Sequence, residues 1–136
     1  MTGLKLTLLA LMVLFASFRT IKAQALAVEI GDVSEVSGYA QIKRNEEPID
    51  ADVKLIIQSN DEAVTTNGRM AITFLDDSTV KLTEHSQLTI DEYIYDPDPS
   101  KSKMALTFGL GTARFITGQL GKIDNRNIAL KTPTAN

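Results

Sequence analysis

Residues 67–82 read Asn-Gly-Arg-Met-Ala-Ile-Thr-Phe-Leu-Asp-Asp-Ser-Thr-Val-Lys-Leu, and the expected fold class follows from their pattern. Large apolar side chains occupy every second position from Met70 to Phe74, and the same spacing returns from Val80 to Leu82. Successive side chains of a β-strand point to opposite faces of the sheet, so a period of two is typical of strands with one buried face. The stretch therefore predicts two strands, each with its apolar side turned toward a core.

Two clusters of turn residues border these strands. Asn67-Gly68 is a strong hairpin signal, because both central residues of a type I′ turn need a positive φ angle. Asp76, Asp77 and Ser78 predict a second turn, because short polar side chains hydrogen-bond to nearby backbone groups. Both clusters are interpreted as structural, with no catalytic or binding role.

The same alternation runs through the chain from residue 28 onward, in short runs that turn residues interrupt. No stretch of this part has the 3.6-residue period of a helix. We therefore expect an all-β domain, either a single antiparallel β-sandwich or a solenoid-like stack of β-hairpins. The chain has no cysteine, so the domain depends on its core alone for stability. The other expected strands lie at Val36–Ile42, Val53–Ile57 (introduced by a turn region at Pro48), Leu88–Ile90, Met104–Leu110, Ala113–Phe115 and Ile128–Leu130.

The N-terminal segment has the layout of a secretory signal peptide. Lys5 precedes an apolar run from Leu6 to Phe18, and Ala23-Gln24-Ala25 provides the small-x-small triplet of a cleavage site. The run is shorter than the roughly twenty residues that span a bilayer. We predict a signal helix that engages the membrane only during export, with cleavage after Ala25 (Ala27 is the alternative). The expected parts are a signal peptide over residues 1–25 and a β-domain over residues 26–136.

Basic residues after the apolar run keep a second interpretation open. Arg19 and Lys22 resist crossing a membrane, which would suit an uncleaved anchor. In both cases the folded part lies outside the cytoplasm. Removing residues 1–25 lowers the number of basic residues from 14 to 11 against 17 acidic ones, so the formal net charge changes from −3 to −6. An acidic domain repels phosphate backbones, so nucleic acid is not an expected partner.

Several pieces of the sequence together resemble the FecR-like periplasmic domain family. Residues 67–82 fit that family's pattern of a Gly, then small-x-Ile-x-Phe-x-Asp-Gly-Ser, then alternating apolar residues. Asp77 stands where the family usually has Gly, and Asp adopts positive φ more easily than most residues. The family normally continues with a further apolar strand, so the resemblance implies a lone domain that is truncated after Asn136. The remaining pieces that fit in order and spacing are Ile30–Val33 with Val36–Ala40, Ser86–Asp96, Gly118–Lys122 and Lys131–Ala135.

The resemblance implies a periplasmic or secreted bacterial domain that acts by protein contact in envelope sensing or signalling. Its implied partner is an envelope protein. The best-known members of the family carry a signal from an outer-membrane receptor to a cytoplasmic sigma factor, and they have a cytoplasmic segment and a transmembrane helix before the β-domain. Here the β-domain is expected to follow a signal peptide, so sigma-factor regulation is not carried over.

The residue content offers little for catalysis or metal binding. His85 is the only histidine, and its place between two expected strands predicts an exposed turn. With one histidine and no cysteine a zinc site is close to excluded, and no Gly-x-Ser-x-Gly elbow or phosphate loop is present. Asp96 and Asp98 are the best candidates for calcium, although solvated turns are the favoured interpretation of all the acidic pairs. We predict no catalytic residue, no metal and no cofactor, and a glycosidase with two facing carboxylates remains an alternative.

Tyrosines are the aromatic residues best suited to a binding surface. Tyr93 and Tyr95 are two positions apart, so within one strand they share a face. They are the candidate residues for a partner surface, although cross-strand packing is the favoured interpretation. Together with Tyr39 and the acidic surface, they also support an alternative function, a glycan- or lipid-binding module of the envelope.

Overall fold

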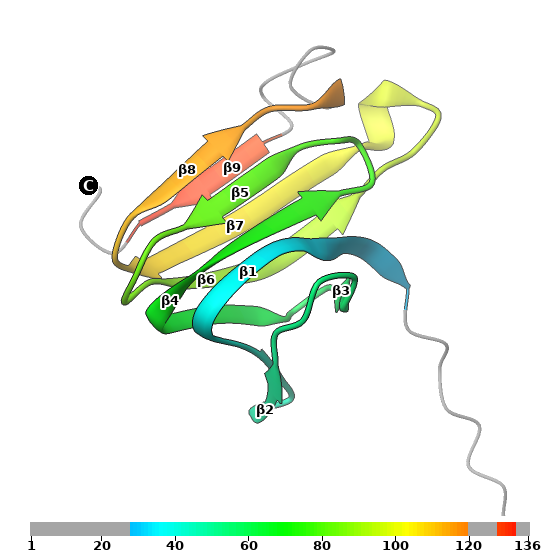
Figure 1. Ribbon diagram of the computed structural model, residues 1–136. Helices are drawn as coiled ribbons and strands as arrows, with labels where there is room; N and C mark the ends of the chain where they lie inside the picture. The colour runs from blue at the N-terminus through cyan, green and yellow to red at the C-terminus, as the bar shows by residue number, and fades with distance from the viewer. Residues whose placement is uncertain (1–27, 120–127, 133–136) are drawn as a thin grey trace, which may run out of the picture.

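The computed structural model describes residues 28–119 and 128–132, and these residues form an all-β fold, as expected (Figure 1). The predicted signal helix and the cleavage site at Ala23 and Ala25 lie outside the described residues. Within them, no helix has the length and apolar character needed to cross a membrane. The elements are β1 (Glu29–Arg44), β2 (Glu47–Asp50), β3 (Ile56–Gln58), β4 (Glu62–Phe74), β5 (Thr79–Leu82), β6 (Gln87–Ile94), the 3-10 turn η1 (Pro99–Lys101), β7 (Lys103–Leu110), β8 (Ala113–Ile116) and β9 (Ile128–Lys131).

Two long strands, β1 and β4, connect two layers of the sheet. The path of hydrogen-bonded neighbours runs β2-β1-β4-β6-β7-β9, while β3 pairs with β1, β5 pairs with β4, and β8 pairs with β5. The first residues of β4, 62–64, pair with β6, and residues 70–73 pair with β5. One layer therefore contains β6, β7 and β9, the other contains β5 and β8, and β1 and β4 belong to both (Figure 1).

The core lies between these layers and follows the predicted alternation. Met70, Ile72 and Phe74 of β4 are buried, and so are Val80 and Leu82 of β5. Burying one such side chain contributes about 1.5–3 kcal/mol. The remaining buried apolar residues are Ile30, Val33, Ala40, Ile42, Ala51, Ile57, Ala63, Ala71, Leu88, Ile90, Tyr93, Met104 and Leu106.

One ladder departs from the expected antiparallel arrangement. β9 pairs with β7 in parallel, with Met104 opposite Ile128 and Thr107 opposite Lys131. Parallel neighbours need a crossover connection rather than a tight turn. The chain makes that crossover by leaving β7, forming β8 in the opposite layer, and returning to β9 (Figure 1). A period of two gives the face of a strand but not its direction, which is why the sequence did not predict this ladder.

The predicted hairpin turn at Asn67-Gly68 is wrong. Both residues lie inside β4, where Gly68 is opposite Gly38 of β1 and the register shifts immediately afterwards. At this bulge β1 and β4 pass from one layer to the other. Gly38 has φ +66°, and a Cβ on Gly68 would lie 2.5 Å from the carbonyl oxygen of Ser37. The glycines are needed because the two backbones approach closely at this corner. Close approach of another backbone is a common reason for glycine within a strand, as a tight turn is between strands.

The corner makes Gly38 sensitive to substitution. Gly38→Ala is expected to lower the free energy of unfolding by about 2 kcal/mol, because the new Cβ needs a strained φ and meets the backbone of Asn67. Gly109→Ala is the matched control, since its Cβ would have no neighbour closer than 3.6 Å. Urea unfolding of both variants measures the difference, and equal stability would contradict the close approach.

The turn predicted at Asp76, Asp77 and Ser78 is confirmed. It joins β4 to β5, with the N–H of Asp77 donating to the carbonyl of Phe74 at 3.0 Å. Asp77 has φ +67°, the conformation that the resemblance assigns to Gly. The turn region expected at Pro48 is instead the edge strand β2, where Pro48 lies opposite Lys43 and its missing N–H is tolerated.

Candidate functional site

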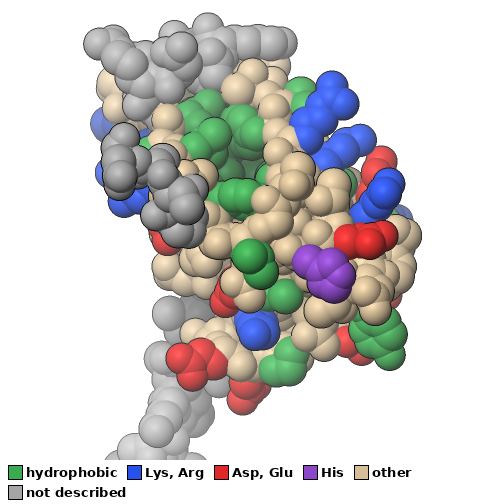
Figure 2. Space-filling view, turned by 90° about the vertical axis from the view of Figure 1, so that its left-hand side faces the viewer, with side chains coloured by type: hydrophobic (Ala, Val, Ile, Leu, Met, Phe, Trp, Pro, Cys, Tyr) green, Lys and Arg blue, Asp and Glu red, His purple; other side chains and the backbone are tan. Residues whose placement is uncertain are grey.

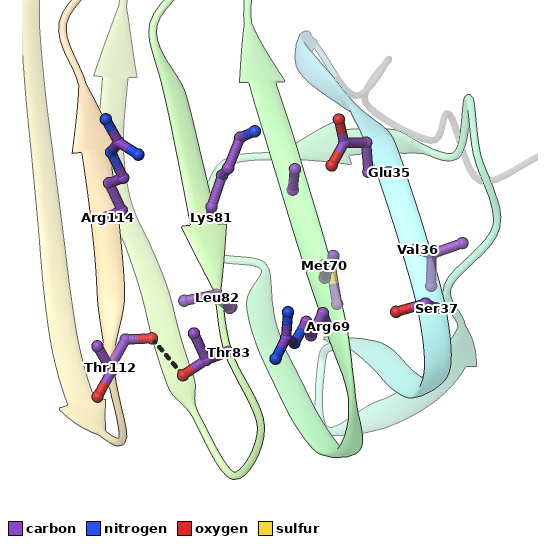
Figure 3. A pocket seen from close by; sticks show the side chains of 11 residues that line it. Glu35, Val36, Ser37, Arg69, Met70, Lys81, Leu82, Thr83, Thr112 and Arg114 are labelled. Carbon is purple, nitrogen blue, oxygen red and sulfur yellow. Dashed lines mark hydrogen bonds between the residues drawn. The ribbon is translucent and has the colours of Figure 1, made fainter.

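A hollow of about 470 Å³ lies on the outer face of the layer that contains β5 and β8. Its central row crosses four strands, because Glu35 pairs with Ala71, Ala71 with Lys81, and Lys81 with Arg114 (Figure 3). Ala71 is buried, and its short side chain leaves room between the longer ones on either side. The site thus consists of long charged side chains around a small residue at the centre of a sheet face.

Three basic side chains line this hollow. Arg69 of β4, Lys81 of β5 and Arg114 of β8 are exposed and line it from three neighbouring strands (Figure 3). Among residues 28–119 and 128–132, none of the three has a carboxylate within ion-pair distance. Lys81 and Arg114 are directly opposite each other in the ladder, where like charges destabilise a sheet. An anionic group bound between them would remove that repulsion.

The two faces of β8 differ sharply in polarity. Thr112, just before the strand, and Arg114 line the hollow, whereas Ala113 and Phe115 point to the space between the layers. There they line an apolar cleft of about 170 Å³. Figure 2 shows this side of the molecule, with hydrophobic side chains around a hollow and basic side chains beside it. The other apolar residues of the cleft are Val80, Leu88, Leu106, Phe108 and Leu130.

β8 is also the edge of its layer. Within the described part of the chain it pairs with β5 and with no other strand. Its outer edge therefore carries backbone N–H and C=O groups without a strand partner there, and such an edge is a template for pairing with another chain.

The predicted surface formed by Tyr93 and Tyr95 does not exist. Tyr93 is 5% exposed and stacks on Phe74 with a ring-centroid distance of 5.1 Å, whereas Tyr95 is 45% exposed and follows the end of β6. The reason is a bulge between Ile90 and Glu92, which moves Tyr93 to the face that already holds Ile90. For Tyr93, the packing interpretation is correct.

Tyr93 instead completes a buried network around the β4–β5 turn. Its hydroxyl donates to Oδ1 of Asp76 at 2.7 Å and accepts from the N–H of Asp76 at 2.9 Å. The hydroxyl of Ser78 donates to Oδ2 of Asp76 and accepts from the N–H of Gly118 at 2.9 Å. The predicted turn residues thus have the structural role assigned to them, and they join β6 to the segment that follows β8.

The network gives the protein an expected sensitivity to alkali. Burial, and then the hydrogen bond to Asp76, raise the pKa of Tyr93 above its ordinary value of 10.0. The unfolded chain therefore releases this proton at a lower pH than the folded one, so stability is full below pH 10 and falls as pH rises above it. The loss is at most about 1.4 kcal/mol per pH unit.

Tyr93→Phe tests this titration. The variant loses about 1 kcal/mol at pH 8, because the hydroxyl hydrogen bonds are removed. Between pH 10 and pH 11 its stability should fall less than that of the wild type. Urea unfolding at each pH measures both curves, and parallel curves would show that another group causes the alkaline loss.

The candidate metal and acid–base residues lie in turns. His85 is exposed in the β5–β6 turn with φ +53°, as predicted. Oδ1 of Asp96 accepts a hydrogen bond from the N–H of Asp98 at 2.8 Å, and Oδ1 of Asp98 accepts one from the N–H of Ser100 at 3.1 Å. Both carboxylates therefore stabilise the loop at η1. Among the residues that the structure describes, no three His, Asp or Glu side chains lie together as a metal site would need.

Sequence reasoning missed the basic hollow. Alternation alone places Lys81 and Arg114 on the polar faces of their strands, but it does not show that these strands are neighbours. Comparisons with models of known protein families, with curated proteins and with solved structures find no match. The candidate site therefore rests on its own geometry and charge.

Proposed function

We propose that this chain is an exported, non-catalytic domain that acts by protein contact in envelope sensing or signalling, as the FecR-like resemblance implies. Its place would be the periplasm or the cell exterior. The observation that supports this most is the cluster of Arg69, Lys81 and Arg114, which have no ion pair within the described residues. In a chain with a net charge of −3, such a cluster is a local surface of opposite sign. Surfaces of this kind steer and orient charged partners.

The hollow is better suited to binding than to chemistry. Its polar groups are three cations, hydroxyl groups and the carboxylate of Glu35 at the far end of the row. The hydroxyl of Thr83 donates to the carbonyl of Thr112 at 3.2 Å, so it is already engaged across the strands (Figure 3). A general base needs a partner and a substrate position within hydrogen-bond reach, whereas a cationic surface only needs an anionic partner.

The alternative of a glycan- or lipid-binding module loses its main support. It rested on the tyrosines together with the acidic surface, and Tyr93 is part of the core. Tyr39 and Tyr95 are exposed but belong to different parts of the fold, the β1 corner and the end of β6. We therefore retain protein contact as the proposal.

Crosslinking in cells tests the proposal. The full chain is expressed in a bacterium, and cell-surface and periplasmic proteins are crosslinked to it. We expect a specific envelope protein to be captured by the wild type and lost with the double variant Lys81→Glu, Arg114→Glu. The matched control is Lys54→Glu, Lys101→Glu, which reverses two exposed cations away from the hollow and should preserve capture. Recovery of the chain from the cytosol, or equal capture by both double variants, would overturn the proposal.

A further inference from the structure

We propose that β8 is a docking edge, to which a partner adds an extended segment of alternating acidic and apolar residues as a β-strand. This inference rests on the proposed function, because it names the kind of segment that the partner presents. Strand addition at a sheet edge takes affinity from backbone hydrogen bonds and specificity from alternate side chains. Both requirements can be examined at β8.

The backbone edge is available but is not sufficient evidence alone. β8 pairs only with β5 within residues 28–119 and 128–132, so its other edge has no strand partner there. However, short edge strands with a charged residue are also a way in which proteins discourage pairing. The four residues of β8, which include Arg114, meet that description. The stronger argument is therefore the kind of neighbour that the side chains on the two faces of this edge require.

At Arg114, the outer face of the edge requires negative charge from a neighbour. A strand added beside β8 would place its outward side chains about 5 Å from that of Arg114, the normal distance between opposite residues. Lys81 lies one strand further in and is directly opposite Arg114. An acidic side chain at this position would neutralise a like-charge pair that has no carboxylate near it in the described residues. A basic or neutral one would leave the repulsion in place.

The inner face of the same edge requires apolar side chains. Ala113 and Phe115 alternate with Arg114 and line the apolar cleft. On the opposite side of the cleft Leu130 of β9 is 54% exposed. Inward side chains of an added strand would extend the cleft lining over Phe115 and Leu130, removing apolar surface from water. Because the period of a strand is two, one segment meets both requirements only if acidic and apolar residues alternate.

Other anionic partners fit one face only. An anionic lipid surface or an anionic polysaccharide would satisfy Lys81 and Arg114. Neither supplies an extended backbone to the β8 edge together with apolar side chains for the cleft. An acidic protein segment is thus the partner class that accounts for the edge, the hollow and the cleft together.

Peptide binding to the purified full chain tests the inference. The probe is a fluorescent ten-residue peptide of alternating Glu and Val with blocked ends. Two controls change one face each: alternating Gln and Val removes the charge, and alternating Glu and Ser removes the apolar contact. We expect the Glu–Val peptide to bind and each control to bind about tenfold more weakly. Arg114→Glu should weaken binding of the Glu–Val peptide about tenfold, with Lys101→Glu unchanged.

Hydrogen exchange locates the bound peptide. Strand addition predicts slower amide exchange in residues 113–116 when the Glu–Val peptide is present. No binding of this peptide, binding without that protection, or equal binding of the Gln–Val peptide would each overturn the inference. Binding to phosphatidylglycerol vesicles or to heparin that depends on Arg114, without binding of the peptide, would overturn it in favour of a lipid or a glycan.

The outcomes separate this inference from the proposed function. If an envelope protein is crosslinked through the hollow but the peptide does not bind, strand addition is wrong and the proposed function stands. If the peptide binds as predicted but the chain is cytosolic or captures no envelope protein, the proposed function is wrong and the docking edge remains.

Discussion

Replacing Arg44 with alanine is expected to lower the free energy of unfolding by about 4 kcal/mol, because the carboxylate of Asp61 then remains buried without its ion pair. The guanidinium donates from Nε to Oδ1 at 3.0 Å and from Nη2 to Oδ2 at 2.9 Å. The side chain of Asp61 is 1% exposed. The hydrogen bond to Asp61 raises the pKa of Arg44 above its ordinary value, so the guanidinium stays charged.

The position of this pair explains the size of the effect. Nη2 of Arg44 also donates to the carbonyl of Ile56 at 2.9 Å, and Oδ2 of Asp61 accepts the N–H of Gln58 at 2.9 Å. The pair therefore holds β3 and the start of β4 against the end of β1. Removing the arginine takes this donor away from Oδ1 of Asp61 and from the carbonyl of Ile56, and leaves Oδ2 with the N–H of Gln58 alone.

Two comparison variants make the Arg44 test specific. Lys103→Ala removes an exposed ion pair with Glu92, whose N–O distance is 3.3 Å, and should cost less than about 1 kcal/mol. The double variant Arg44→Met, Asp61→Leu removes both charges and should recover much of the lost stability. Urea unfolding measures all three. A loss for Arg44→Ala no larger than that for Lys103→Ala would refute the buried-charge argument.

Asp76→Ala is expected to have the second-largest effect, a loss of about 3 kcal/mol. The carboxylate accepts hydrogen bonds from the hydroxyl groups of Tyr93 and Ser78. Alanine leaves both of these donors buried without this acceptor. The N–H of Ser78 also points to Oδ1 of Asp76, at 3.3 Å. The variant thus removes the centre of the network that joins the β4–β5 turn to β6.

The neighbouring aspartate provides the control for this variant. Asp77 is exposed and has φ +67°, so Asp77→Gly should be neutral or slightly stabilising. Thermal unfolding compares the two, and Asp76→Asn should be intermediate because the amide retains one acceptor. If Asp76→Ala and Asp77→Gly unfold at the same temperature, the network contributes nothing and our account of the turn is wrong.

The sequence predicted most of the strands but not their partners, and the strand expected at Val53–Ile57 is instead a turn at residues 53–54 followed by β3. Alternation predicted the strands around Ile72, Val80 and Leu106, because burial of one face of a strand gives its apolar residues a period of two in the sequence. It failed at Asn67-Gly68, because a tight turn and a close approach of two backbones both select glycine. Only the position of Gly38 on the opposite strand distinguishes the two cases.

The candidate site also depends on strand pairing that the sequence pattern does not show. A bulge of one residue between Ile90 and Glu92 reverses the faces of all later residues in β6, and no local signal marks it. Likewise, Lys81 and Arg114 become neighbours only through the β5–β8 ladder, which joins distant parts of the chain. Long-range pairing, rather than local preference, therefore creates both the basic hollow and the burial of Tyr93.

The shared strands also determine how the domain unfolds. β1 and β4 run through both layers, so the loss of either strand removes strand pairing from both layers at once. We expect a single cooperative transition, without a stable half-folded intermediate. Because the corner joins residues as distant as Gly38 and Gly68, that pairing has a high contact order, and folding should be slow compared with that of a helical protein of equal length.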